Sequence, residues 1–179
     1  MSIQIFILSK LMEDNNYPYK LKKQLSEPIP LDRLGGLTES KLYYHFESLV
    51  KQGLVEQVEV IKEEHRPDKQ VFAITNKGRE ELPKKIYKLL ENADDLSDMV
   101  VGIASIKYVD RERVLNILQR KSDHIRAQWM NLKDFEHKVQ LDEENKNLIE
   151  FVGGYISTRV DHTVYWLDEL IQQIQEGKI

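Results

Sequence analysis

Side chains suited to nucleic-acid recognition gather on a predicted helix over residues 38–51. On a helical wheel Leu42, Phe46 and Leu49 fall together as the face that packs on a core. The opposite face carries Ser40, Tyr44, Glu47, Ser48 and Lys51. A helix that enters a DNA groove displays such an exposed aromatic ring among hydroxyl, ammonium and imidazole groups, so we expect Tyr44 to point to solvent.

Two kinds of contact with DNA are expected from this helix and its neighbours. Ser40, Tyr44 and His45 have groups that reach base edges, which specify sequence. Lysine and arginine side chains, and the helix start at Thr38, suit phosphates, which fix the register on the duplex. The candidate DNA contacts are Tyr19, Lys20, Thr38, Ser40, Lys41, Tyr43, Tyr44 and His45, with Lys62, Arg66 and Lys69 in a later segment. The alternative interpretation of each is an ordinary solvated side chain.

The sequence contains no pattern typical of a catalytic or metal site. Its five histidines include no pair four residues apart, so no metal ligand set is expected. Asp134 and His137 have the spacing of a hydrogen-bonded pair, but no nucleophile or oxyanion site accompanies them. The glycine pairs at 35–36 and 153–154 lack the partner residues of a phosphate loop. We therefore expect no enzyme activity, no cofactor and no bound metal.

Composition is that of a soluble globular chain, and its charge is unevenly distributed. The whole chain has a net charge of -4 and no cysteine, which excludes disulfides and thiolate chemistry and fits a reducing cytoplasm. The apolar runs are too short to cross a bilayer. Residues 1–88 hold 15 Lys and Arg against 13 Asp and Glu, whereas residues 89–179 hold 11 against 17. Only the first part is electrostatically suited to a phosphate backbone.

The first half predicts three helices and a β-hairpin. Apolar spacing indicates a first helix around residues 3–11, and a second, basic helix begins near Pro18. Thr38 is a good N-cap for the third helix. Two valine-rich segments then flank the charged residues 62–69, as in a hairpin. This order is that of a winged helix-turn-helix, whose third helix enters the major groove.

The second half predicts helices only. After a helix capped at Thr75, we expect a short apolar helix over residues 96–106 and long helices that start at Asp110 and Asp142. The last helix bears an apolar stripe wider than one neighbouring helix covers, which favours a homodimer. The expected dimer contacts are Leu148, Phe151, Val152, Tyr155, Arg159, Trp166 and Leu170. Plain intramolecular packing is the alternative.

Two further features of the second half have open interpretations. The glycines at 153–154 indicate close helix approach or a kink, because each costs on the order of 1 kcal/mol in a helix. The aromatic residues Trp129, Phe135, Tyr155 and Trp166 suit either an effector pocket or a core, and helical spacing favours core. The predicted fold class is thus mainly α, with a winged helix-turn-helix domain at residues 1–92 and a helical dimerisation domain at residues 93–179.

Three blocks of sequence, at residues 17–25, 37–55 and 66–78, resemble the PadR family of regulators. The pair Tyr44-His45 departs from the usual family pattern, in which a small residue or proline follows the tyrosine. Arg159 with Trp166-Leu167 is similar to the terminal helix of the longer members, in which the C-terminal helices mediate dimerisation. The resemblance implies a repressor that binds DNA as a dimer, released in some relatives by a phenolic or other aromatic molecule.

The expected function is accordingly sequence-specific binding of a palindromic operator by a cytoplasmic homodimer. Its partners would be double-stranded DNA, a second copy of the chain and a small aromatic effector, with no membrane. One alternative is a winged-helix module whose basic face binds an acidic protein, since a fold does not dictate its use. Another is a sensor whose main task is binding an aromatic ligand.

Overall fold

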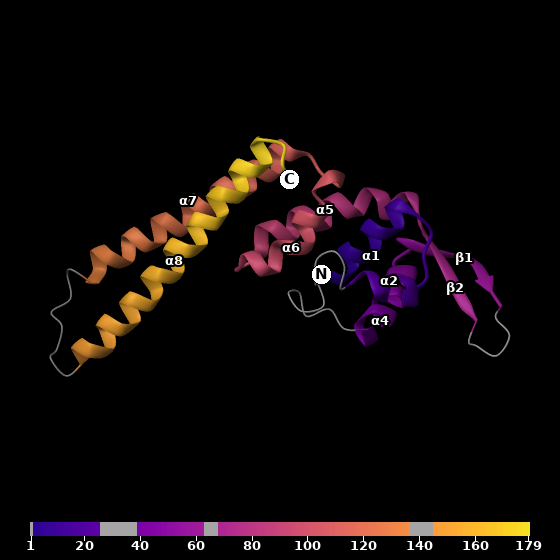
Figure 1. The fold of residues 1–179 in the computed structure, drawn as a ribbon, viewed down its shortest axis with the longest axis horizontal. Helices are drawn as coiled ribbons and strands as arrows, with labels where there is room; N and C mark the ends of the chain where they lie inside the picture. Colours follow the sequence, from indigo (N-terminus) through magenta and orange to yellow (C-terminus); the bar gives the residue numbers. More distant parts are fainter. Residues whose placement is uncertain (1, 26–38, 63–67, 137–144) are drawn as a thin grey trace. The chain divides into compact units, whose positions relative to one another are not determined.

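The structure is a computed structural model that describes residues 2–25, 39–62, 68–136 and 145–179 (Figure 1). The chain divides into two compact units, Met1–Asp110 and Arg111–Ile179. Within the described ranges, no helix has both the length and the apolar character needed to cross a membrane.

Unit 1 is a helical bundle around one almost completely buried helix. Its elements are α1 (Ser2–Glu13), α2 (Pro18–Gln24), α4 (Glu39–Lys51), β1 (Val55–Ile61), β2 (Lys69–Ile74), α5 (Asn76–Asn92), α6 (Leu96–Ala104) and the 3-10 helix η1 (Ile106–Tyr108). Helix α1 contacts α4, α5, α6 and β2, so Ile5, Ile7 and Leu8 are completely inaccessible to solvent. The three helices and the hairpin predicted for the first half are confirmed, in the predicted order.

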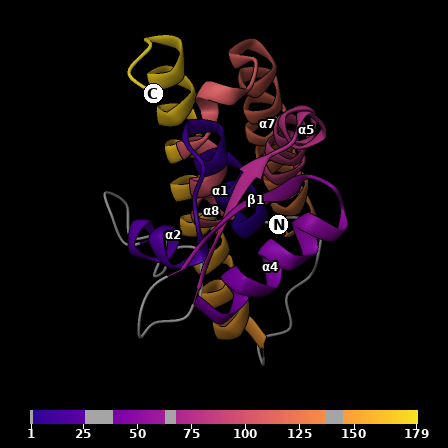
Figure 2. The same cartoon turned by 90° about the vertical axis from the view of Figure 1, so that its right-hand side faces the viewer.

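Strands β1 and β2 form an antiparallel hairpin whose residues pair from Val55 with Ile74 to Ile61 with Lys69. On its other edge, β2 pairs with Asn16 through two backbone hydrogen bonds to Phe72, of 2.8 and 3.1 Å. These bonds join the hairpin to the connection between α1 and α2. The hairpin, α2 and α4 therefore lie together on one side of unit 1 (Figure 2).

The hairpin joins α5 at a tightly packed corner. The predicted N-cap at Thr75 is confirmed, because its Oγ1 accepts a hydrogen bond of 3.0 Å from the backbone N–H of Gly78. The same hydroxyl donates to the carbonyl of Gly53 at 2.8 Å. A Cβ at Gly78 would lie 2.1 Å from the carbonyl oxygen of Leu54, so only glycine fits between α5 and the chain that leaves α4.

Residues 96–108 pack with the first unit rather than with the long C-terminal helices. Helix α6 contacts α1 and α5, and the hydroxyl of Ser9 donates to that of Ser105 at 2.8 Å across a buried contact. The boundary between the two compact units lies after Asp110, whereas the boundary predicted from the sequence lies after residue 92. The single helix predicted over residues 96–106 is instead α6 followed by η1.

Unit 2 consists of two long helices, α7 (Arg111–Glu136) and α8 (Lys146–Gln175), that pack side by side (Figure 1). Their shared core includes Val114 and Leu118 of α7 and Leu167 and Ile174 of α8. The buried hydroxyl of Ser122 donates to Asp168 at 3.0 Å, and Arg126 forms an ion pair with the same carboxylate. The predicted start of α7 at Asp110 is confirmed, while the predicted start of α8 at Asp142 falls outside the described residues.

Candidate nucleic-acid interface

Helix α4 separates a core face from a solvent face as the sequence predicts. Leu42, Phe46 and Leu49 are at most 2% exposed, whereas Tyr44 is 68% exposed. Ser40, Lys41 and Tyr43 are also exposed. The buried residues hold α4 against α1 and α2. The exposed side chains therefore project from a rigid helix. This is the geometry in which a helix presents side chains to a partner surface.

Helix α2 adds basic groups beside α4. Lys20 forms an exposed ion pair with Asp14, at 3.6 Å. The ammonium groups of Lys22 and Lys23 lie 6.0 and 5.4 Å from the centre of the Tyr19 ring, at distances suited to cation–π attraction. Tyr19 itself is 49% exposed. These contacts keep a positive surface next to the outer face of α4.

The hairpin contributes the remaining predicted contacts within the described residues. Lys62 follows β1 and is exposed, and Lys69 begins β2. The ammonium of Lys69 lies 5.3 Å from the centre of the Tyr17 ring, so the hairpin contacts the start of α2. Thr38 and Arg66, the other two candidate contacts, lie outside the described residues.

His45 occupies a different environment from Tyr44, although both were predicted to reach base edges. Its ring is only partly exposed and packs edge-on against the Tyr44 ring, with 5.3 Å between the ring centres. Its Nδ1 atom is buried and has no hydrogen-bond partner among the described residues. Burial lowers the pKa of His45 below its ordinary value, and nearby positive charge, including that of Lys41, lowers it further. The pKa shift favours a neutral imidazole at this position.

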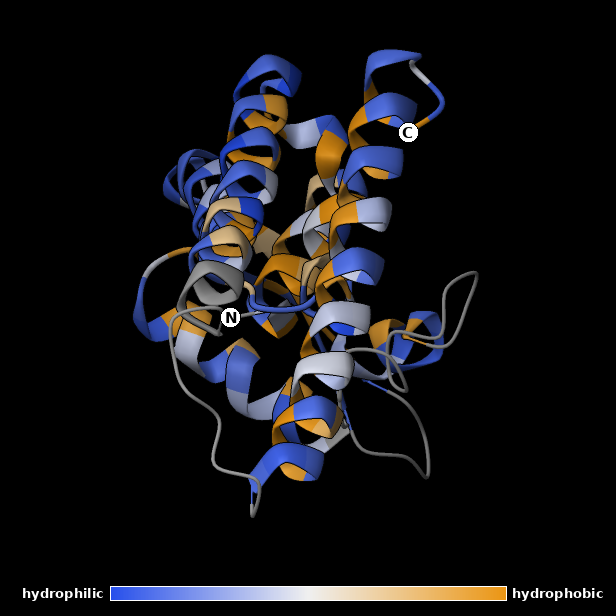
Figure 3. Ribbon diagram, turned by 90° about the vertical axis from the view of Figure 1, so that its left-hand side faces the viewer, coloured by the Kyte–Doolittle hydropathy of each residue, from blue (hydrophilic) through white to orange (hydrophobic). Residues whose placement is uncertain are grey.

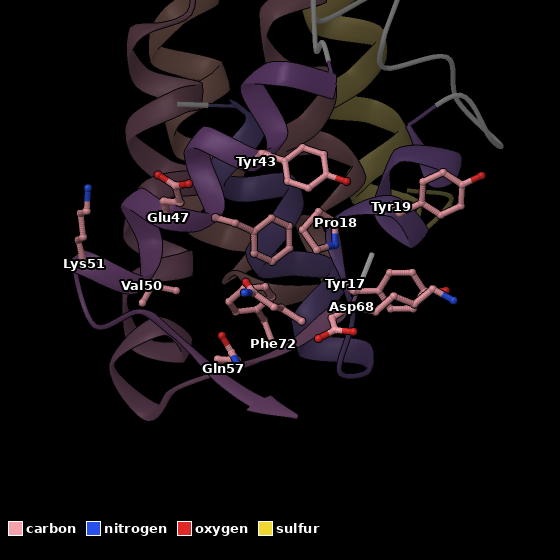
Figure 4. Close-up of a pocket in the computed structure, with 13 residues that line it drawn as sticks. Tyr17, Pro18, Tyr19, Tyr43, Glu47, Val50, Lys51, Gln57, Asp68 and Phe72 are labelled. Carbon is pink, nitrogen blue, oxygen red and sulfur yellow. The ribbon is translucent and has the colours of Figure 1, made fainter. Parts of the chain in front are cut away.

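A groove of about 880 Å³ lies between α2, α4 and the hairpin (Figure 4). Its walls include Tyr19 and Tyr43, two of the predicted DNA contacts. They also include Tyr17, Val50 and Phe72, which the sequence analysis did not single out. No spacing rule could have identified these three, because they come from separate elements that meet only through packing.

Helix α8 has two apolar faces, of which α7 covers one. Val164, Leu167, Leu170, Ile171 and Ile174 are buried within unit 2. Four of the residues predicted to form a dimer contact are exposed in the single protomer, as such a contact requires: Leu148 (62%), Phe151 (74%), Tyr155 (60%) and Trp166 (46%). Val152 is 41% exposed and Arg159 is also exposed, whereas Leu170 is buried within its own protomer. Figure 3 shows apolar and polar segments alternating along the helix that leads to the C-terminus.

The aromatic residues of unit 2 do not form the core that their spacing favoured. Tyr155 and Trp166 are exposed in the protomer, since α7 is the one helix packed on α8 in this unit and it covers the other face. Trp129 is partly exposed, and the side chain of Phe135 lies outside the described set. A Cβ at Gly154 would meet no atom of another segment within 4 Å, so no close approach among the described residues explains that glycine.

Among the residues that the structure describes, no group of three acidic, histidine or cysteine side chains could hold a metal ion. His137, one member of the Asp134–His137 pair, lies outside that set, as does the side chain of Asp134.

The fold of unit 1 defines a winged helix-turn-helix, in which α4 occupies the place of the recognition helix and the hairpin that of the wing. Residues 7–84 match the Transcriptional regulator PadR-like family. This domain is therefore PadR-like, and the resemblance found in the three sequence blocks, which lie within the matched residues, is confirmed. The matched family is one of transcription regulators, and unit 1 of this chain is similar to its winged-helix domain.

Several solved structures are similar to the chain over nearly its whole length. Bacillus subtilis PadR in complex with operator DNA is 15% identical, with a TM-score of 0.42 over 97% of this chain and 99% of the other. The PadR-like regulator BC1756 from Bacillus cereus is 19% identical, with a TM-score of 0.42 over 95% and 96%. Bacillus subtilis PadR in complex with p-coumaric acid is 16% identical, with a TM-score of 0.39 over 98% and 99%. No curated protein matches the chain.

Proposed function

We propose that the chain is a repressor that binds a palindromic operator as a homodimer and is released by a small aromatic effector. The observation that carries the DNA-binding part is the exposed face of α4. Its Tyr44 is 68% exposed, directly opposite core residues that are at most 2% exposed. A large aromatic side chain on the exposed face of a rigid helix is available to a partner, and the hydroxyl of Ser40 and the ammonium of Lys41 beside it suit DNA.

The proposed contacts divide into base readers and phosphate binders. Tyr44 and Ser40 lie where α4 would meet base edges, and His45 supports the Tyr44 ring from the side. Lys20, Lys41, Lys62 and Lys69, together with Thr38 and Arg66, would bind phosphates on either side of the groove. Tyr19 and Tyr43 would pack against the sugar-phosphate backbone.

Dimerisation is proposed from the second apolar face of α8. Phe151 and Tyr155 are 74% and 60% exposed in the protomer. Exposed apolar surface of this extent on one helix face is typical of a subunit interface. A symmetric pair would present two copies of α4 to successive major grooves, which requires half-sites about 34 Å apart or a multiple of it.

The effector part of the proposal rests on the likeness of residues 7–84 to the PadR-like family and on the aromatic residues of unit 2. Bacillus subtilis PadR is known in complex with p-coumaric acid. Release requires that the effector bind the DNA-free state more tightly than the DNA-bound state, whatever its absolute affinity.

The first experiment is selection of genomic fragments bound by the full chain, followed by titration of a selected duplex and of its scrambled version. We expect the scrambled duplex to bind at least tenfold more weakly. If each dimer neutralises about eight phosphates, the slope of log affinity against log salt is near -7. An affinity that does not change with salt, or failure to select any fragment, would refute DNA binding and favour a protein-interaction module.

Two variants then separate the proposed roles. Tyr44→Ala should reduce the preference for the selected duplex by about 1–3 kcal/mol, while Lys69→Ala should weaken both duplexes alike and reduce the salt slope by about 1. Lys88→Ala is the matched control, because Lys88 is an exposed lysine of unit 1 that lies on α5. Equal loss of discrimination from the first two variants would contradict the division into base readers and phosphate binders.

A further inference from the structure

The two hairpin lysines proposed to bind phosphates, Lys62 and Lys69, are held in different ways. The ammonium of Lys69 lies 5.3 Å from the centre of the Tyr17 ring, within the range of about 6 Å over which an aromatic face attracts a cation. Lys69 is also only partly exposed. Lys62 is exposed and has no ring or ion-pair contact among the residues that the structure describes. The side chain of Lys69 is therefore the more restricted of the two.

The contact with Tyr17 gives the hairpin a second attachment to the start of α2. The first attachment is the backbone pairing of Asn16, the residue before Tyr17, with Phe72. Lys69 lies three residues from Phe72 on β2, which corresponds to about 10 Å along a strand. The Tyr17 side chain makes no capping hydrogen bond, although Tyr17 is the N-cap residue of α2. Its ring therefore holds the outer part of β2 and has no role in starting the helix.

A lysine that is held in place before DNA arrives should bind a phosphate more tightly. A mobile lysine loses side-chain freedom when it binds, and this loss lowers affinity. Part of that freedom is already lost in Lys69, because its ammonium lies against a ring. The ammonium has three N–H donors, and those that point away from the ring can still donate to phosphate oxygens. The ring contact and the phosphate contact can therefore exist together.

We propose that Tyr17 is a positioning residue for DNA binding, whose ring holds the Lys69 ammonium where it meets a phosphate. Tyr17 acts through Lys69 and not through a contact of its own with DNA. The inference rests on the part of the proposed function in which the chain binds duplex DNA. Because phosphates carry no sequence information, the effect of Tyr17 should be the same on a selected operator and on its scrambled version.

The ring contact is measured first, in the full chain without DNA. With ¹³C-labelled lysine, the ring current of Tyr17 should shift the εCH₂ protons of Lys69 upfield, and Lys69→Ala identifies their signal. Tyr17→Leu should abolish the shift, whereas Tyr17→Phe should keep it, because phenylalanine retains the ring face. An εCH₂ signal of Lys69 that is unchanged in Tyr17→Leu would overturn the proposal.

A double-mutant cycle then measures the role of the contact in DNA binding. Tyr17→Leu should weaken binding of a duplex about two- to fivefold, as expected for loss of a cation–π contact at an exposed site. In a Lys69→Ala background the same change should have no effect, because no ammonium is left to position. Equal weakening in the two backgrounds would show a general structural role, and tighter binding by Tyr17→Leu would show that the ring competes with the phosphate; either result refutes the inference.

Two controls isolate the ring face and the particular lysine. Tyr17→Phe should bind duplex as the unmodified chain does, and a loss equal to that of Tyr17→Leu would assign the effect to the hydroxyl instead. In a Lys62→Ala background Tyr17→Leu should keep its full effect, because Lys62 does not contact the ring. Loss of the effect there would contradict the assignment to Lys69.

The cycle is run on both the selected duplex and the scrambled duplex, so that the two proposals fail separately. If the chain binds both duplexes alike, the operator function fails, while coupling between Tyr17 and Lys69 still supports the positioning role. If the chain prefers the selected duplex and the cycle shows no coupling, only the positioning role fails. A chain that binds neither duplex refutes both.

Discussion

Replacement of Phe151 by alanine provides the strictest test of the proposed dimer. Phe151 is 74% exposed in the protomer, and a phenylalanine side chain buries on the order of 200 Å². About 150 Å² is therefore available to a partner, of which alanine retains roughly a third. The loss of about 100 Å² at ~25 cal/mol per Å² amounts to roughly 2.5 kcal/mol.

Because a symmetric dimer contains two copies of each contact, the expected loss is about 5 kcal/mol per dimer. At about 1.4 kcal/mol for each factor of ten, the dissociation constant of the dimer should rise between three and four orders of magnitude. Sedimentation of the variant over a wide range of concentrations measures this change directly. Far-UV circular dichroism should remain unchanged, since Phe151 contributes little to the core of its own protomer.

The matched control for Phe151→Ala is Met130→Ala. Met130 is 68% exposed but belongs to α7, so its loss should leave the dimer intact. If both variants sediment as the unmodified chain does, or if that chain is a monomer at all concentrations, the exposed face of α8 is not a dimer contact. If the Met130 variant dissociates and the Phe151 variant does not, the interface lies on α7.

Three further predictions concern stability. Gly78→Ala should destabilise unit 1 by about 1–3 kcal/mol in thermal or urea unfolding, because the added Cβ would meet the backbone of Leu54. Gly154→Ala should stabilise the chain by up to about 1 kcal/mol, because nothing lies within 4 Å of the added methyl group and alanine favours a helix; destabilisation would contradict the open space there. The lowered pKa of His45 means that the unfolded chain takes up this proton first as the pH falls. Stability should thus decrease from about pH 6.5 downward, and His45→Gln should make that decrease smaller; an identical pH profile would refute the assignment.

The helices and the hairpin of unit 1 were predictable because their signals are local. The spacing of Leu42, Phe46 and Leu49 predicts which face of α4 is buried, and their exposure of at most 2% confirms it. The cap at Thr75 follows from side-chain chemistry over three residues, and its hydrogen bond of 3.0 Å is present. The exposure of Tyr44 was likewise predictable, since it follows from the period of a helix.

The groove and the division of the chain into units were not predictable in this way. Tyr17 and Phe72 are separated by many residues, and they meet because the backbone of Asn16 pairs with β2. Val50 joins them because α4 packs against α2 and β1. The packing of α6 on α1 depends on contacts such as that between Ser9 and Ser105, which no periodicity reveals. These features depend on which helix and strand surfaces pack together in the folded chain.

Helix α8 shows which features the sequence determines and which depend on tertiary packing. Its sequence by itself determined that the helix forms and that it carries more apolar surface than one neighbour can cover. Only the tertiary structure decided that α7 takes the face with Leu167 and Ile174 and leaves Phe151 and Tyr155 in water. The physical reason is that a helical repeat specifies which residues share a face, whereas burial is settled by the shape and position of whatever packs against it.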